Sequence, residues 1–306
     1  MKWFNIIAIA GTALLAGCDK QPSSDGVAPR KSGRFQVYAT NYPLAYFAER
    51  ISGTELDVVY TAPKDKDPAF WQPTDAEIAA FQSADLILMN GATYSKWAEK
   101  VSLPDSKVID TSAGFKDHFI EVKDAFTHSH GKQGEHSHNG TPFTTWIDFQ
   151  QAIAQADAIC AAFQKLMPES IEMFALNYDL LKKELLTLDS RMESIGKKIA
   201  GQPIVASHPV YQYWARRYGI NLKHVLWEPE EVPDDAQMED LKKILSAHPA
   251  KWMVWEGEPA KESVEKIKAL GLSSVVFDPC ANTPDKGDWR DRMEANVKGM
   301  EKLAGG

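Results

Sequence analysis

Short apolar runs and amphipathic stretches alternate over the first part of the chain. The apolar runs have the length and residue types of buried strands: RFQVYAT (34–40), LDVVY (56–60), DLILMN (85–90) and KVID (107–110). The stretches between them have helical spacing, at 44–52, 75–83 and 93–100. Such a βαβ series predicts a parallel sheet with helices on both of its faces.

The same alternation returns in the last third of the chain. Strand-like runs occur at QPIVAS (202–207), KWMVW (251–255) and SSVVF (273–277). Helical patterns lie near 209–217, 236–247 and 259–270. A second α/β lobe is therefore expected.

A long helical pattern separates the two series. From 169 to 200 the chain has no proline and places apolar residues at helical spacing, at Ile171, Phe174, Leu181, Leu185, Leu188 and Met192. A helix of this length is a rod of about 45 Å, long enough to brace one lobe against the other.

Together these patterns predict an α/β protein with two lobes, each a parallel sheet flanked by helices, joined by one long rigid helix. The ligand cleft is expected between the lobes. The predicted divisions are an N-terminal lobe (35–165) with a histidine-rich loop (112–146), a linking helix (166–200) and a C-terminal lobe (201–306).

The chain begins with an export signal. Lys2 precedes an apolar stretch and small residues, and the quartet LAGC resembles a bacterial lipobox, so 1–17 is expected to be removed and Cys18 to be lipidated. Residues 18–34 are polar and rich in Gly, Pro and Ser, which is typical of a flexible tether. We expect a periplasmic protein anchored to a membrane through its lipid.

The net charge limits the partners. The formal charge of −8 becomes −9 once Lys2 is lost, and no basic stripe is present to neutralise phosphates, so a nucleic-acid partner is not expected. Beyond Cys18 only Cys160 and Cys280 occur, without the spacing of a metal knuckle, and a disulfide between them is left open.

Four of the eight histidines lie within HSHGKQGEHSH (128–138), where no hydrophobic residue accompanies them. Clustered neutral imidazoles are typical metal ligands, so His128, His130, His136 and His138 are candidate ligands.

Three further candidates each follow a strand of the second series. His208 follows QPIVAS, Glu256 follows KWMVW and Asp278 follows SSVVF. Because parallel strands end at one edge of their sheet, these side chains are expected on one rim, and a histidine with carboxylates suits zinc or manganese.

The chain also resembles the zinc/manganese solute-binding lipoproteins of ABC transporters. The resemblance covers nearly the whole chain after the tether, in ATNYPLAYFAERISG, DPAFWQPTDAEI, SADLILMNGATYSKWAEK, LNYDLLKKELLTLDSRM, IVASHPVYQYWARRYGI and VVFDP. It implies capture of Zn²⁺ or Mn²⁺ as a transported ligand and delivery to a permease and its ATPase. It also implies a monomer that is no enzyme.

The resemblance assigns His208 and Asp278 to two of the family's four ligand positions. At the other two, this chain has Ala69 in DPAFW and Phe143 or Thr144 in TPFTTWID, which cannot replace histidine. The leading hypothesis is that the histidine-rich loop folds back to supply imidazoles. Alternatively, that loop is a separate capture or delivery segment and the cleft holds a weaker, solvent-completed ion.

In a third alternative the cleft takes a chelated metal or an organic solute against an aromatic lining, with candidates Phe70, Trp71, Phe143, Trp146 and Trp214. Packing between the lobes is the simpler role for these aromatics.

Two functions from other classes are alternatives to transport. A metallohydrolase is disfavoured because no HExxH motif or nucleophile elbow occurs, and a metal-storage or adhesion lipoprotein remains an alternative. Since a neutral imidazole is needed, metal uptake is expected to weaken below about pH 6.5.

Overall fold

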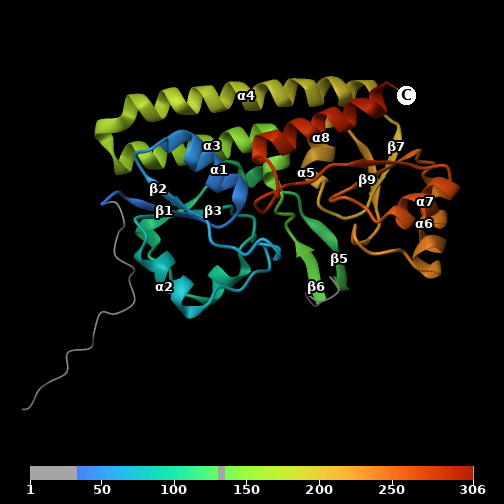
Figure 1. Ribbon diagram of the computed structural model, residues 1–306, viewed down its shortest axis with the longest axis horizontal. Helices are drawn as coiled ribbons and strands as arrows, with labels where there is room; N and C mark the ends of the chain where they lie inside the picture. The colour runs from blue at the N-terminus through green and yellow to red at the C-terminus, as the bar shows by residue number, and fades with distance from the viewer. Residues whose placement is uncertain (1–32, 130–134, 306) are drawn as a thin grey trace, which may run out of the picture.

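Two four-stranded parallel sheets lie side by side beneath a shared layer of helices in the computed structural model (Figure 1). The structure describes residues 33–129 and 135–305, and of 122–129 and 135–140 only the backbone. The predicted α/β class, the two lobes and the long joining helix are confirmed.

The N-terminal sheet has the strand order β2-β1-β3-β4. Its strands are β1 (Gln36–Ala39), β2 (Asp57–Val59), β3 (Leu86–Met89) and β4 (Val108–Asp110). The helices α1 (Tyr42–Ser52) and α2 (Asp75–Ser83) connect them, and α2 begins with a capping box between Thr74 and Glu77. The pattern at 93–100 forms only short 3-10 helix, η1 (Lys96–Lys100), and a second 3-10 turn, η2 (Asp105–Lys107), precedes β4.

The C-terminal sheet has the order β10-β9-β7-β8. Its strands are β7 (Pro203–Ala206), β8 (Asn221–His224), β9 (Trp252–Trp255) and β10 (Ser273–Val276). The helices α5 (Gln212–Tyr218), α6 (Asp235–Ala247) and α7 (Lys261–Ala269) connect its strands. The sequence pattern missed β8, an edge strand with no buried residue.

The helix layer joins the two lobes. After the 3-10 turn η6 (Pro168–Ser170), α4 (Ile171–Lys198) runs over both sheets and packs on α3 (Phe149–Leu166), α1, α5 and α8 (Trp289–Ala304) (Figure 1). Ion pairs reinforce this packing. Both Nη atoms of Arg50 donate hydrogen bonds to the Glu184 carboxylate of α4, at 2.8 and 2.9 Å, and Arg191 donates to Glu301 of α8 at 2.8 Å.

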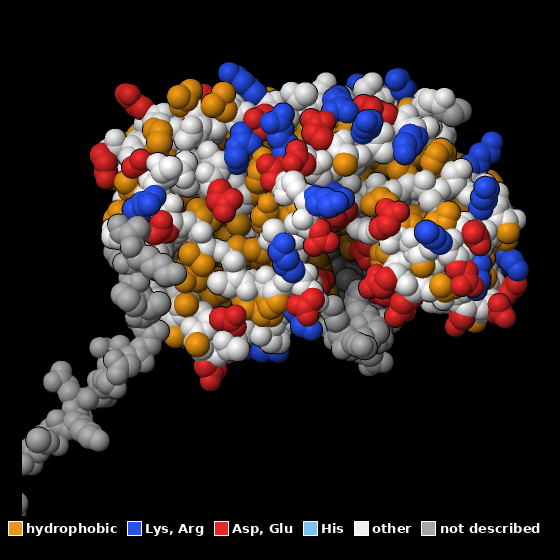
Figure 2. Space-filling model, viewed as in Figure 1, with side chains coloured by type: hydrophobic (Ala, Val, Ile, Leu, Met, Phe, Trp, Pro, Cys, Tyr) orange, Lys and Arg blue, Asp and Glu red, His pale blue; other side chains and the backbone are white. Residues whose placement is uncertain are grey.

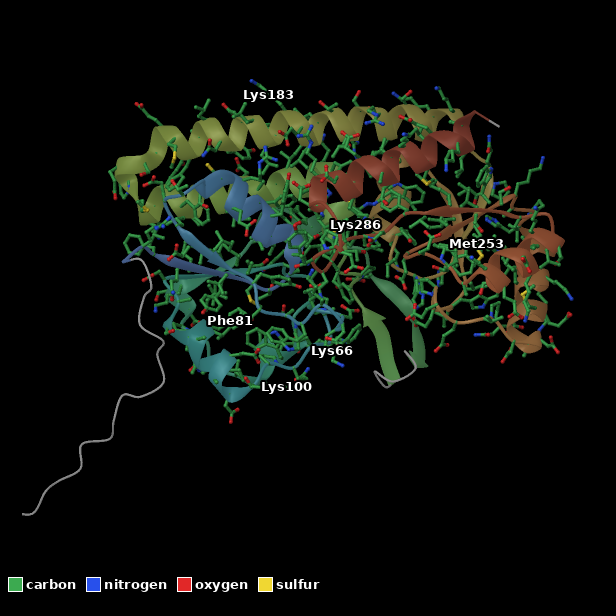
Figure 3. The ribbon with its side chains drawn as sticks, in the orientation of Figure 1. Lys66, Phe81, Lys100, Lys183, Met253 and Lys286 are labelled. Atoms are coloured by element: carbon green, nitrogen blue, oxygen red, sulfur yellow. The ribbon has the colours of Figure 1, made fainter. Side chains whose placement is uncertain are left out.

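One large core extends through the helix layer into both lobes, and each lobe adds a smaller core of its own. Phe81 belongs to the small core of the N-terminal lobe and Met253 to that of the C-terminal lobe, as Figure 3 shows. Because α4 contributes Phe174, Leu185 and Met192 to the shared core, the lobes are packed together along their backs.

The segment 112–146 is not the irregular loop that the sequence predicted. After the 3-10 helix η3 (Ala113–His118), the strands β5 (Val122–Ser129) and β6 (Glu135–Gly140) form an antiparallel pair, and the 3-10 helix η5 (Thr145–Ile147) follows. The prediction rested on apolar periodicity, which a strand pair held by backbone hydrogen bonds does not need.

Further sequence expectations concern covalent and membrane attachment. Cys160 and Cys280 are both buried and free, so the disulfide that the sequence left open is absent. The signal segment, Cys18 and the tether up to residue 32 lie outside the described residues. Within the described part of the chain, no helix has both the length and the hydropathy to span a membrane.

Candidate metal centre

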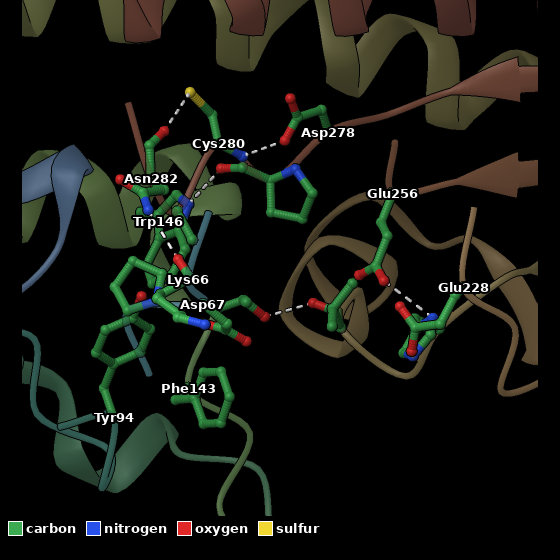
Figure 4. Close-up of a pocket in the computed structure, with 16 residues that line it drawn as sticks. Lys66, Asp67, Tyr94, Phe143, Trp146, Glu228, Glu256, Asp278, Cys280 and Asn282 are labelled. Atoms are coloured by element: carbon green, nitrogen blue, oxygen red, sulfur yellow. Dashed lines mark hydrogen bonds and ion pairs between the residues drawn. The ribbon is translucent and has the colours of Figure 1, made fainter. Parts of the chain in front are cut away.

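Three metal-ligating side chains meet at the carboxyl edge of the C-terminal sheet. His208 follows β7, Glu228 follows β8 and Glu256 follows β9. One ligand atom from each lies within 4.8 Å of the other two. Both glutamates pair with the His208 imidazole, and Figure 4 shows the Glu228 and Glu256 side chains on the same side of the cavity. In the part of the chain that the structure describes, no other group of three His, Cys, Asp or Glu side chains meets this criterion.

The two carboxylates face opposite nitrogens of His208. Its Nδ1 lies 3.0 Å from Oε1 of Glu256, and its Nε2 lies 3.4 Å from Oε1 of Glu228. The imidazole is 1% exposed, whereas the glutamate side chains keep 14% and 21% of their surface. The backbone amide of Glu256 donates to Oγ of Ser207, which ties the ends of β9 and β7 together.

This surrounding favours a proton on His208 when no cation is bound. Burial by itself lowers the pKa of His208, but the charges and hydrogen bonds of Glu256 and Glu228 outweigh it and raise the pKa to about 10. Burial and the neighbouring His208 lower the pKa of His224, which keeps that second imidazole neutral. The site therefore stabilises a positive charge between two carboxylates.

Asp278 lies near this group without belonging to it. Its Oδ1 accepts a hydrogen bond from the Cys280 amide at 2.7 Å, and its Oδ2 lies 3.3 Å from Nε of Arg292. Burial raises the pKa of this carboxyl, while the Cys280 amide and Arg292 act in the opposite direction. Figure 4 shows the Asp278 carboxylate directed to the Cys280 amide.

A cavity of about 280 Å³ opens beside the three-residue cluster. His208, Glu228, Glu256 and Asp278 all line it, which places every candidate from the C-terminal sheet on one cavity. The opposite wall comes from the N-terminal half of the chain and combines the aromatic rings of Tyr94, Phe143 and Trp146 with the charged residues Lys66 and Asp67.

The aromatic candidates divide between the cavity and the core. Phe143 and Trp146 line the cavity, and Tyr94 stands edge-on to both rings, with centroids 5.2 and 5.6 Å away. Trp71 and Trp214 belong to hydrophobic cores and do not line the cavity. Trp146, a cavity residue, is also a member of the shared core, and Phe70 and Phe143 pack against that core. Lobe packing thus accounts for part of the set that the sequence indicated.

The two positions without a family ligand remain apolar in space. Ala69 is 1% exposed, and its amide donates to Oδ1 of Asp67 at 2.8 Å. Phe143 presents its ring to the cavity. The side chains of His128, His136 and His138, and the whole of His130, lie outside what the structure describes, so their role as ligands stays a prediction.

Glu228 is the residue that the sequence reasoning missed. It lies in the segment that follows β8, just as His208 and Glu256 follow β7 and β9. The available signal was an acidic residue shortly after NLKHVLW. It was overlooked because NLKH has too few apolar residues to indicate a strand.

The surface around the C-terminal lobe is acidic on one side. On the face shown in Figure 2, Asp and Glu side chains gather along the lower edge of that lobe. Charge of this sign raises the local concentration of cations near the cleft.

Comparison with known proteins identifies the family. Residues 37–303 match the model of the family described as zinc-uptake complex component A, periplasmic. The high-affinity zinc uptake system protein ZnuA of Bacillus subtilis is 28% identical over 320 residues, covering 98% of this chain and 97% of that protein.

Solved structures share the fold. The metal-dependent lipoprotein YcdH from Bacillus subtilis has a TM-score of 0.74 at 21% identity, over 88% of this chain and 99% of that one. The Zn(II)-bound ZnuA-like domain of Streptococcus pneumoniae AdcA has a TM-score of 0.73 at 19% identity, over 89% and 99%. Since the family model spans most of the sequence, the chain belongs to the periplasmic zinc-uptake component A family.

Proposed function

We propose that this protein captures Zn²⁺ at His208, Glu228 and Glu256 and delivers it to the permease and ATPase of an ABC transporter. The observation that carries the proposal is the convergence of one imidazole and two carboxylates within 4.8 Å at the cavity. The zinc-uptake names of the relatives support the same cargo.

The donor set suits zinc in charge and in chemistry. A neutral imidazole with two carboxylates brings two negative charges, which balance a divalent cation. Tetrahedral zinc spaces its ligand atoms about 3.4 Å apart, so the cluster would contract slightly on loading. Because the two carboxylates face opposite ring nitrogens, the glutamate beside the non-coordinating nitrogen has to turn toward the ion on loading. Manganese, which prefers oxygen ligands, ranks second.

The site binds its cargo without transforming it. The family is one of transport components, and our proposal for this chain is reversible capture and release. We propose further that the mature protein is a monomer in the periplasm, anchored through lipidated Cys18. The histidines at 128, 130, 136 and 138 then collect or pass on zinc near the cavity, and Asp278 remains a candidate ligand for a loaded state.

Zinc titration of the metal-free mature protein tests this proposal. We expect one zinc at the cleft in wild type, loss of that binding in His208→Ala, and retention of it in a variant that lacks 128–138. Uptake is tested by growth in zinc-depleted medium, where a strain carrying Glu228→Gln should fail and one carrying Glu230→Gln should grow. Glu230 is a matched control, because it lies in the same segment and is exposed. Wild-type protein that takes up no zinc would refute the proposal.

A further inference from the structure

We propose that the cleft takes zinc as a complex with a small amino-carboxylate chelator, of the kind a free amino acid forms, rather than as a bare ion. This inference rests on the proposed function, since it needs zinc at His208, Glu228 and Glu256. It adds a second component to the cargo.

The first argument is the space beside the cluster. The cavity of about 280 Å³ is close to the lower limit of pockets that bind small organic molecules, about 300 Å³. All three members of the cluster come from the C-terminal sheet, so an ion held there leaves space between itself and the opposite wall, whose lining includes Asp67.

The second argument is that hydrogen bonds across the cavity fix its width. Asn282, from the C-terminal half, donates to the carbonyls of Pro63 and Lys66 at 2.8 Å each and accepts from the Tyr60 hydroxyl at 3.0 Å. Nε1 of Trp146 donates to the Pro279 carbonyl at 2.7 Å. The aromatic wall is therefore held at its distance from the cluster, and the space between them persists.

The third argument is the chemistry of the far wall. The Tyr94 side chain is 1% exposed and lines the cavity, and its buried hydroxyl has no hydrogen-bond partner among the described residues. A buried donor without a partner costs about 1–3 kcal/mol in stability. An acceptor atom on the cargo would form the missing hydrogen bond and remove this cost. Burial raises the pKa of Tyr94 well above its ordinary value, which keeps the hydroxyl a donor.

The remaining wall residues suit a zwitterion with carbon atoms. Phe143 and Trp146 offer apolar contact, and the same lining includes Asp67 and Lys66, whose ammonium lies 3.8 Å from Asp65. The amino nitrogen and one carboxylate oxygen of the cargo chelate zinc, which with three protein ligands expands to five-coordinate. The second carboxylate oxygen accepts from the Tyr94 hydroxyl.

The experiment uses zinc and L-histidine as the probe. Zinc binding to the metal-free mature protein is measured alone and with one equivalent of L-histidine, and labelled histidine retained by the protein is counted after dialysis. We expect about one histidine per zinc, retained only when zinc is present. Tyr94→Phe should weaken histidine retention about tenfold, which is the effect of one lost hydrogen bond. Its affinity for zinc in the absence of histidine should stay within about twofold of wild type.

Matched controls and alternative results separate this inference from the proposed function. Tyr38→Phe, outside the cavity, should behave as wild type. Zinc that binds while histidine is stripped would overturn the chelate inference and leave the proposed function standing. Retention of zinc with citrate but not with histidine would refute the amino-carboxylate class. Failure to bind zinc under every condition would refute both proposals.

Discussion

Nε of Arg292 lies 3.3 Å from Oδ2 of Asp278, and the other carboxylate oxygen of Asp278 is hydrogen-bonded to the Cys280 amide. Both oxygens of this acidic residue are thereby engaged by positively polarised groups of the protein. Glu228 and Glu256, in contrast, both face the His208 imidazole. Asp278 and the two glutamates are therefore expected to differ in their effects on zinc.

We expect Asp278→Asn to lower the affinity for zinc by at most about 10- to 100-fold. Losses of this size are typical when the mutated residue does not bind the metal itself but supports the residues that do. Glu228→Gln should lower it further, because it removes a carboxylate oxygen from the cluster itself. Calorimetric titration of both variants with zinc measures the difference. A larger loss in Asp278→Asn than in Glu228→Gln would reverse the assignment.

The affinity for zinc should rise with pH up to about 10. Zinc requires the neutral imidazole, while Glu256 and Glu228 keep a proton on His208 up to its pKa of about 10, so zinc must displace that proton. From the sequence alone, the loss of affinity is expected below about pH 6.5, because that expectation takes the pKa of an isolated imidazole. Titrations at pH 7.5 in two buffers of different ionisation enthalpy should show about one proton released per zinc. Release of none would contradict the protonated state of the empty site.

The stability of the metal-free protein should fall as the pH rises from 6.5 to 10. The pKa of His208 is raised from 6.5 to about 10 in the folded chain, so the folded state binds more protons in this interval. The proton on His208 therefore stabilises the folded state fully below pH 6.5, and this contribution is lost as the pH rises through about 10. Denaturant unfolding across this interval should show a steeper decline for wild type than for His208→Gln. Equal slopes would show that the proton is not held.

The long helix offers a test of the shared core. Leu185→Ala should lower the free energy of unfolding by about 2–5 kcal/mol, because the Leu185 side chain is 1% exposed in the core that joins the lobes. The adjacent Leu186 is 41% exposed, so Leu186→Ala should change it by no more than about 0.5 kcal/mol. Similar losses in both variants would place the packing face of α4 elsewhere.

Much of the fold was predictable because its strands and helices carry their patterns locally. Strands such as β3 and β9 are nearly continuous apolar runs, as parallel strands covered on both faces must be. The apolar pattern does not predict the strand β8, because β8 lies at the edge of the sheet, where Asn221 and Lys223 face solvent. The α-helices α3 and α8 were also missed, although both carry buried apolar faces.

The candidate site was predictable only as far as it depends on strand ends. His208 and Glu256 were selected because each follows an apolar strand, and the structure brings both to one cluster. Glu228 required knowledge of β8. The pairing of Asp278 with Arg292 joins the segment after β10 to α8, which only tertiary packing brings together, and no local pattern indicates it.

Anomalous diffraction from crystals of the mature protein loaded with zinc tests the central claim most directly. We predict a zinc peak at the cavity, with His208 nitrogen and oxygens of Glu228 and Glu256 at about 2.0–2.2 Å from the ion. A zinc held solely by histidines of the 128–138 segment, or bound away from His208, would contradict the account.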